Sequence, residues 1–484
     1  MHDDPLARFS SFADVKNEQL CSLLQLCGYC CTDFKYYWIP PVFMFPKDGR
    51  TTLTVDDIPK KWYNIAVDIG SPEILNPGTM KPVTHDDLAP VFCKTSVEQE
   101  LDTTHRFIDI PDVVREAYAQ FGRVTPLQRA YHLEQYLKTP AKIYFKREDV
   151  SPTGSHKLNS AIAQAYYNKR DGTEHLTTET GAGQWGSALS LSCNYFDLDL
   201  IVFMVKVSFE QKPFRRSIME TYGGTVYPSP SSVTEYGKSV LAKDPSYGGT
   251  LGTAITEAVE MAVKDTTGKT KYSLGSVANH VCMHQTVIGQ ELICQLNEID
   301  VTPDHMIACV GGGSNFAGFT FPMIHKKLHG KIDTSFLAVE PSEVPSLTKG
   351  EYRYDFGDSG CITPMFKMHT LGHDFTPNAV HAGGLRYHGM NPLVSRLYDN
   401  KTINAVSYTQ EQVFQAAVTF ARTEGIIPAP ESSHAIRAAV ELALEAKKKN
   451  EEQIIVFNLS GHGLLDMTGY ANHFKTCKQT VIEV

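Results

Sequence analysis

The stretch IYFKREDVSPTGSHKLNSAIAQAY, residues 143–166, shows the unit from which much of the chain is built. It begins with the apolar run Ile143–Phe145, and a loop rich in serine, threonine and glycine follows. Five apolar residues then occupy the i, i+3, i+4, i+7, i+8 positions of one buried helix face, namely Leu158, Ala161, Ile162, Ala165 and Tyr166. The stretch therefore predicts a strand, a polar loop and a helix that starts near residue 157.

The same alternation continues toward the C-terminus. Buried strands are predicted at 176–178, 201–207, 305–310, 336–340 and 454–457. Helices are predicted to begin near Trp185 and at Pro213, and a long helix to cover 431–449. Alternating strands and helices favour an α/β fold in which helices cover both faces of a parallel sheet. Residues 350–392 are rich in glycine, histidine and tyrosine and lack periodicity, which predicts a functional loop region.

The composition of the 484-residue chain is that of an ordinary soluble globular protein, with 42% hydrophobic and 20% charged residues. A net charge of -9 argues against nucleic acid or an anionic membrane as a partner. No uncharged apolar stretch approaches the roughly 18 residues of a membrane-spanning helix. The N-terminus is too acidic for a secretory or mitochondrial signal, and 11 scattered cysteines fit reduced thiols, so we expect a cytoplasmic protein. Cys27 and Cys30 lack a second pair at zinc-finger spacing, and no metal site is predicted.

Lys157 lies in the segment SHKLN, residues 155–159, at the first turn of the predicted helix. The positive end of the helix dipole would lower the pKa of its amine there. The uncharged amine is the form that attacks a carbonyl carbon to make an imine. Lys157 is therefore a candidate nucleophile, whereas the alternative is a solvated surface lysine, which is what most lysines at helix starts are.

Three consecutive glycines, Gly311–Gly313, join a predicted strand to a helix, and Ser314 and Asn315 follow them. Glycines let the backbone approach an anion with its N–H groups turned inward, and the helix start and two polar side chains add donors. The segment has neither a Walker lysine nor the Gly-x-Gly-x-x-Gly order of a dinucleotide fold. It predicts a phosphate-binding cup in preference to a simple tight turn.

Two more segments lie at junctions between strands and helices. ETGAGQW, residues 179–185, places small residues at a helix entrance that suits a carboxylate, and Glu179 is either an acid/base catalyst or a helix-stabilising charge. NLSGHG, residues 458–463, supplies Ser460, whose hydroxyl either bonds a neutral ring nitrogen or takes part in a plain turn. Such junctions converge on one edge of a parallel sheet. Together they suit pyridoxal 5′-phosphate, with a lysine for the aldehyde, glycines for the phosphate and a serine for the pyridine nitrogen.

Five motifs, present in order, carry a resemblance to one known family. They are SHKLN (155–159), ETGAGQ (179–184), GGGSN (311–315), EGI with ESSHA (424–426 and 431–435) and LSG (459–461). The chain resembles the β chain of tryptophan synthase, a fold-type II enzyme that uses pyridoxal phosphate, from about Tyr63 to Tyr470. Trp185, the segment HAGGLRYHGM (381–390) and NLSGHG resemble its stand-alone class, also called the second β type.

The resemblance implies an α/β fold of two subdomains, each with a largely parallel sheet flanked by helices. Residues 63–475 would form the catalytic domain, with a smaller subdomain at about 156–274 that includes a mobile region. A larger subdomain would cover about 275–475 and the preceding segments, and residues 1–62 would be an N-terminal extension of unknown role. The family also implies a homodimer and leaves a monovalent cation open.

Roles for single residues follow from the same resemblance. Lys157 would hold the cofactor aldehyde and carry the α-proton of serine, while Glu179 would assist loss of the hydroxyl and activate indole. The other implied cofactor-binding residues are His156, Gly311, Gly312, Gly313, Ser314, Asn315, Glu424 and Ser460. The implied substrate-binding residues are Thr180, Gly181, Ala182, Gly183, Gln184, Trp185 and Arg386.

Arg386 departs from the common β chain, which has an aspartate after this Gly-Leu pair. A guanidinium suits the geometry of a phosphate, so we expect O-phosphoserine to be an amino-acid donor beside serine. The same departure casts doubt on productive pairing with an α chain, whose signal passes through this region.

The implied reaction, catalysed by a carbon–oxygen lyase, joins indole to L-serine and gives L-tryptophan, the last step of tryptophan biosynthesis. The alternative is a serine or threonine deaminase that releases the same aminoacrylate, but Glu179 favours replacement because simple elimination needs no acid/base group for indole. A non-catalytic scaffold that binds the cofactor is a third reading.

Overall fold

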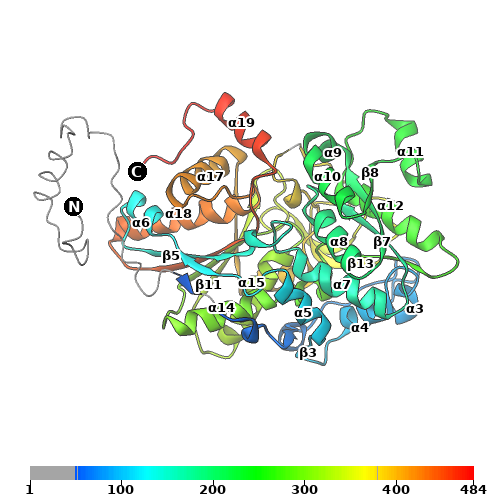
Figure 1. Ribbon diagram of the computed structural model, residues 1–484, viewed down its shortest axis with the longest axis horizontal. Coiled ribbons are helices and arrows are strands. Elements are labelled where there is room, and N and C mark those ends of the chain that lie inside the picture. The colour runs from blue at the N-terminus through cyan, green and yellow to red at the C-terminus, as the bar shows by residue number, and fades with distance from the viewer. Residues whose placement is uncertain (1–49, 52, 379) are drawn as a thin grey trace, which may run out of the picture. The chain divides into compact units, whose positions relative to one another are not determined.

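A seven-stranded sheet organises one half of the molecule in the computed structural model, which describes residues 50–51, 53–378 and 380–484 (Figure 1). Its strand order is β1 (Arg50–Thr51), β4 (Leu127–Arg129), β5 (Lys142–Arg147), β15 (Ile454–Leu459), β10 (His305–Cys309), β11 (Ser335–Pro341) and β14 (Asn404–Tyr408). The five strands from β5 to β14 are parallel, whereas β4 and β1 add antiparallel pairs at one edge.

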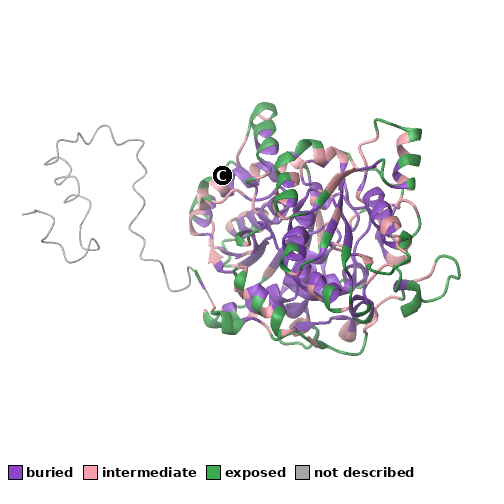
Figure 2. Ribbon diagram, turned by 45° about the vertical axis from the view of Figure 1, so that its right-hand side comes forward, coloured by how far each residue is buried: buried purple, intermediate pink, exposed green. Residues whose placement is uncertain are grey.

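Successive side chains along these strands point to opposite faces of the sheet, and each face contributes to a separate hydrophobic core. On β15, Ile455 and Phe457 belong to the core under α6 (Tyr131–Leu137), α17 (Gln410–Glu424) and α18 (Ser432–Lys449). Val456 points to the opposite core, under α14 (Val287–Glu298) and α15 (Ser314–Leu328). The sheet is therefore a middle layer between two helical layers, and Figure 2 shows its strands as largely buried.

A second sheet has the strand order β8 (Thr225–Ser229), β7 (Asp199–Val205), β6 (His175–Thr180) and β9 (Thr270–Tyr272), and all its pairs are parallel. Alternate residues of β7 again face two cores. Val202 and Met204 pack with α7 (Leu158–Arg170) and α8 (Gln184–Tyr195), while Phe203 and Val205 pack with α12 (Leu251–Lys264). This sheet lies within the 156–274 range expected for a smaller subdomain.

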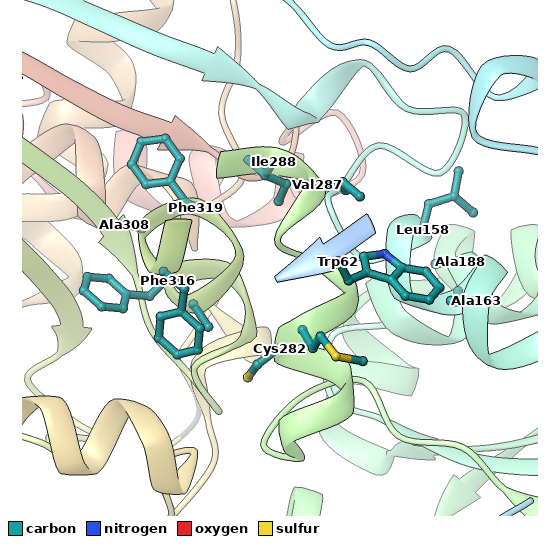
Figure 3. Packing of buried hydrophobic residues seen from close by; sticks show 14 of the residues in the cluster. Trp62, Leu158, Ala163, Ala188, Cys282, Val287, Ile288, Ala308, Phe316 and Phe319 are labelled. Carbon is teal, nitrogen blue, oxygen red and sulfur yellow. The ribbon is translucent and has the colours of Figure 1, made fainter. Parts of the chain in front are cut away.

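The helices on the inner faces of both sheets share one core, which fixes the position of one sheet relative to the other. Trp62 of β2 (Lys61–Tyr63) has no exposed surface and belongs to this cluster, and in Figure 3 its ring lies beside residues of α7 and α8. Phe316 and Phe319 of α15, a helix that covers the larger sheet, belong to the same core. Burial of such large aromatic side chains is a dominant contribution to core stability.

The remaining helices and strands cover the ends and edges of the two sheets. They are α2 (Ala66–Ile69), α3 (His85–Leu88), α4 (Lys94–Leu101), β3 (Phe107–Asp109), α5 (Asp112–Gln120), α9 (Lys206–Gln211), α10 (Pro213–Thr221), α11 (Glu235–Lys243), α13 (Asn279–His284), β12 (Glu351–Phe356), β13 (Met365–Thr370), α16 (Pro392–Asp399) and α19 (Met467–Thr476), with short 3-10 turns at Val55–Asp57, Glu148–Val150 and Gly383–Leu385. Among the described helices, none is both long and apolar enough to cross a bilayer.

Two sequence expectations differ from the structure. The strand expected at 201–207 ends at Val205, because α9 begins at Lys206. The loop expected over 350–392 was wrong in part: β12 and β13 form an antiparallel pair in which Glu351 lies opposite Thr370. The compact unit of the fold covers Arg50–Val484. Cys27 and Cys30, which have the spacing of half a zinc site, lie outside the described residues.

A buried network of charges connects the larger sheet to α7 and α14. Arg123 donates to Glu291 of α14 at 2.7 Å and to Glu148, which follows β5, at 3.0 Å. Lys146 of β5 donates to the same Glu291 carboxylate at 2.8 Å. The side-chain oxygen of Asn159, on α7, also accepts from Arg123 at 2.6 Å. Since these groups are buried, each cation depends on its carboxylate for compensation.

Replacing Glu291→Ala should therefore lower the free energy of unfolding by about 3–5 kcal/mol, because two buried cations would lose a shared partner. Denaturant unfolding of the purified variant measures this loss. Glu452→Ala is the matched control, since Glu452 pairs with Lys142 at the surface and its removal should cost at most about 1 kcal/mol. Equal small losses in both variants would contradict the role given to the network.

Candidate active site

Four of the predicted site segments lie at the carboxyl ends of parallel strands. Lys157 immediately precedes α7, and Glu179 lies near the end of β6. Gly311–Gly313 connect β10 to α15, and Ser460 follows β15. The carboxyl ends of parallel strands in each sheet share one edge, and this is where α/β proteins place ligands.

Lys157 borders a small cavity and is only partly exposed. Its Nζ donates to the backbone oxygen of Gly275 at 3.0 Å. Burial lowers the pKa of this amine below its ordinary value, and nearby carboxyls, Glu179 first among them, oppose the shift. The shift has the direction expected from the sequence, and its largest cause is desolvation of the amine.

The triple-glycine turn has no room for side chains. A Cβ on Gly311 would lie 2.6 Å from the backbone oxygen of Gly384, and one on Gly312 would lie 2.4 Å from Ser276 Oγ. Gly313 has φ +105°, a conformation that residues with a Cβ rarely adopt. The turn ends at the first residue of α15, so its free backbone N–H groups and the helix dipole suit a phosphate.

His156 and Ser460 lie side by side next to this region. The backbone N–H of His156 donates to the backbone oxygen of Ser460 at 3.0 Å. Burial lowers the pKa of His156 to about 3, and its Nε2 has no hydrogen-bond partner among the described residues. Ser460 Oγ lies 2.8 Å from Ser432 Oγ, a pair that can offer a hydroxyl to a neutral ring nitrogen.

The residues present fit pyridoxal phosphate. The glycine turn is a cradle that any Cβ would fill, and a neutral buried imidazole has a nitrogen without a partner among the described residues. The amine of Lys157, with its lowered pKa, lines a cavity whose wall includes Gly384 and Ser276, and the glycine turn contacts both of these residues. The side chain of Asn315 was expected to donate to the phosphate. Its amide instead donates to the backbone oxygen of Cys309 at 2.9 Å, a bond that connects the two ends of the glycine turn.

Glu424, which was predicted to bind the cofactor, does not line the small cavity that Lys157 borders. It ends α17 and accepts a hydrogen bond from the backbone N–H of Leu133, on α6, at 2.8 Å. Glu431 reaches the site instead: its carboxylate accepts from the backbone N–H of Gly384 at 2.8 Å. Gly425, with φ +71°, ends the helix, so the next seven residues lead the chain away from Glu424 and toward the site.

Glu179 is a buried carboxyl with two hydrogen-bond donors. Tyr272 Oη donates to its Oε2 at 2.5 Å, and the backbone N–H of Gly275 donates to Oε1 at 3.3 Å. Burial raises its pKa to about 7, although these hydrogen bonds act in the opposite direction. A carboxyl with this pKa exchanges protons readily near neutrality.

The predicted carboxylate-binding segment lines the small cavity together with Lys157 and Glu179. Its lining members are Thr180, Gly181, Ala182, Gln184 and Trp185. Gly183 is set apart and faces Arg215, since a Cβ there would lie 2.7 Å from Arg215 Cβ. Trp185 Nε1 donates to Thr178 Oγ1 at 2.7 Å, which fixes the ring in the wall.

A second, larger cavity of about 250 Å³ adjoins the first. Three residues line both cavities: Glu179, Leu251 and Ser276. Most of the remaining wall is apolar or aromatic, as in Phe92 and Ile255. The arrangement offers space for an apolar, flat ligand on the side of Glu179 away from Lys157.

Arg386 is one of three buried cations in this region, and the other two, Lys212 and Arg215, were not predicted as site residues. Its Nη2 donates to Ser208 Oγ at 2.6 Å. Lys212 donates to Asp466 Oδ1 at 2.5 Å, and Arg215 lies 3.6 Å from Asp466 Oδ2 with no hydrogen-bond partner for its guanidinium among the described residues. The basic run KPFRR, residues 212–216, is the feature of the sequence that could have indicated this cationic group.

One His/Asp group in the described part of the chain has ligand atoms within 4.8 Å of one another: Asp68, His325 and His329. The Asp68 carboxylate already accepts from Arg106 at 2.8 Å, from Tyr63 at 2.5 Å and from His325 at 3.1 Å. It is better described as the centre of a hydrogen-bond network than as a metal ligand.

Comparison with known proteins gives a consistent result. The family model described as pyridoxal-phosphate dependent enzyme matches residues 118–461. The tryptophan synthase beta chain 2 of Methanosarcina mazei is 55% identical over 433 residues, which are 89% of this chain and 97% of the relative. The protein of the same name from Aeropyrum pernix is 53% identical over 427 residues, or 88% and 95% of the two chains.

Solved structures show the same fold at much lower identity. An L-serine ammonia-lyase from Rhizomucor miehei aligns with a TM-score of 0.56 and 17% identity, covering 74% of this chain and 99% of the other. The threonine deaminase isoform 2 of Solanum lycopersicum aligns with a TM-score of 0.55 and 19% identity, covering 73% and 88%. The extent and identity of the sequence matches show that this chain belongs to the tryptophan synthase beta chain family of pyridoxal-phosphate dependent enzymes.

Proposed function

We propose that this protein joins indole to L-serine, with loss of water, to form L-tryptophan. The observation that carries the proposal is the position of Glu179, whose carboxyl lines both the small cavity of Lys157 and the larger apolar cavity. A replacement reaction needs two substrates on either side of one proton-transferring group. A deaminase needs only water as its second reactant, and an apolar cavity would serve no purpose in it.

The residues of the small cavity have separable tasks. Pyridoxal phosphate, when bound, withdraws electrons from the α-carbon of the amino acid and so allows its β-substituent to leave. Lys157 Nζ, with its lowered pKa, takes the proton from the α-carbon and later returns it. Backbone N–H groups at the start of α8, within Thr180–Gln184, bind the carboxylate.

Glu179 acts on the leaving and entering groups. In its protonated form it gives a proton to the departing hydroxyl oxygen, which leaves as water. As a carboxylate it then takes the proton that indole loses from C3 when the new carbon–carbon bond forms. A pKa of about 7 suits both directions of transfer near neutral pH.

We also propose that O-phosphoserine serves as a donor. Arg386 lies next to Gly383 in the wall of the small cavity, and Lys212 and Arg215 share the single carboxylate of Asp466. Arg215 keeps its guanidinium N–H groups free among the described residues. Such a cluster compensates a leaving phosphate better than a leaving hydroxide. The family resemblance further supports a cytoplasmic homodimer that works without an α chain.

Lys157→Ala should abolish tryptophan formation and remove the visible absorbance of the lysine-bound cofactor. The visible spectrum, followed by product analysis after addition of serine and indole, measures both. Lys169→Ala is the control, because Lys169 lies at the other end of the same helix, where it binds Asp197 at the surface. A variant at position 157 that still formed tryptophan would overturn the assignment, and pyruvate as the only product of the unmodified enzyme would favour the deaminase.

Tyr272→Phe should move the acidic limb of the pH profile to higher pH. The Tyr272 hydrogen bond lowers the pKa of Glu179, so its removal raises that pKa above about 7. The base form needed to take the indole proton is then lost at a higher pH as the solution is acidified. The dependence of kcat/KM for indole on pH measures the shift. Tyr387→Phe is the control, since Tyr387 donates to the backbone oxygen of Gly357, and its profile should keep the original limb.

Arg386→Gln should lower kcat/KM for O-phosphoserine by at least about tenfold, because a guanidinium–phosphate contact contributes about 1.5–3 kcal/mol. The value for serine should change much less. Arg422→Gln, at an exposed position of α17, should change neither donor. Turnover with each donor, with and without an added α chain, provides the measurement. Strict use of serine together with strong activation by the α chain would refute the proposal.

A further inference from the structure

Glu100 and His280 form a buried pair in the wall of the larger cavity, and the reaction steps above make no use of it. Glu100 lies on α4 and His280 on α13, and both line the cavity. Glu100 Oε2 lies 2.6 Å from His280 Nδ1, and the backbone N–H groups of Asn279 and His280 donate to the same carboxylate at 3.1 and 3.0 Å. Since an ionised carboxylate can only accept, Nδ1 carries the proton.

The other ring nitrogen of His280 has no hydrogen-bond partner in the described part of the chain. Its Nε2 is buried and is the one such orphaned side-chain atom among the described residues that line this cavity. Other polar groups of the wall are satisfied: Tyr272 donates to Glu179, and Tyr387 donates to the backbone oxygen of Gly357. The edge-on contact with Phe92, at 6.1 Å between ring centroids, helps to fix the imidazole plane.

Building on the proposed function, we propose that His280 is a specificity-determining residue whose Nε2 accepts a hydrogen bond from the N–H of the indole ring. Glu100 holds the proton on Nδ1, so Nε2 is an acceptor in the neutral ring. The neutral acceptor is matched to a neutral aromatic donor in an otherwise apolar space. With the ring nitrogen held at His280, Glu179 remains free for the proton at C3.

The same geometry explains how the cavity would reject similar molecules. An aromatic bicycle without an N–H would fill the apolar space but would leave His280 Nε2 desolvated and unpaired. A buried polar group without its partner is costly, and sites built around a substrate N–H discriminate strongly against analogues that lack it. The preference should therefore depend on the acceptor at position 280 and not on the shape of the cavity alone.

Binding of two probes to the holoenzyme, without an amino acid present, tests the proposal. The probes are indole and 1-benzothiophene, which share a shape but differ in the N–H, and calorimetric titration gives a Kd for each. We expect the unmodified enzyme to bind indole at least about tenfold more tightly, a ratio equal to one hydrogen bond of about 1.4 kcal/mol. In His280→Leu the two Kd values should become equal within about twofold.

Three further variants separate recognition from structure. His280→Gln keeps an acceptor oxygen and should retain part of the preference. Glu100→Gln can donate to Nδ1, which turns Nε2 into a donor, so the preference for indole should be lost although His280 is intact. Ile255→Ala removes wall area but no acceptor, and it should weaken both probes by the same factor.

An unchanged ratio of the two Kd values in both His280→Leu and Glu100→Gln would overturn the inference, whether or not the enzyme makes tryptophan. If instead the ratio collapses in these variants while the unmodified enzyme forms no tryptophan, the inference stands and the proposed reaction fails.

Discussion

Removal of water from the space between the two sheets is the constraint on which the site depends. It acts on two groups of opposite charge type: it lowers the pKa of the Lys157 amine and raises that of the Glu179 carboxyl to about 7. Both shifts favour the neutral forms, and both bring the groups closer to the pH at which they exchange protons. An amine or carboxyl at the open surface would keep its ordinary pKa and remain charged.

The architecture creates this dry space because the two sheets share a core without merging. Helices α7 and α8 from the smaller sheet share one core with α14 and α15 from the larger one, with Trp62 within the cluster. Their carboxyl edges supply the glycine turn, the lysine, the carboxylate-binding segment and the serine. Beneath them, the charges of Arg123, Lys146 and Glu291 fix the position of α7 relative to α14.

The sequence predicted correctly those helices and strands whose formation depends on interactions between residues a few positions apart. The apolar spacing of α7, the strand before Gly311 and the proline that starts α10 each act within a few residues, and the structure has these elements at those places. The glutamates Glu424 and Glu431 flank one turn seven residues apart, and only the packing of that turn shows that Glu431 is bonded to Gly384 while Glu424 is bonded to Leu133. The pair Glu100 and His280 is separated by 180 residues, and no local pattern connects its members.

The two sides of Glu179 have opposite chemical character, and this contrast explains why one carboxyl can serve two substrates. On one side the small cavity is lined by Lys157 and by the start of α8, and Arg386 lies next to Gly383 of its wall, which all suit an anionic amino acid. On the other side the wall is apolar, with the Glu100–His280 pair as a polar contact of defined direction. Water would blur this contrast because it solvates both kinds of ligand, so a closed interior is a condition for selecting both substrates as well as for the proton transfers.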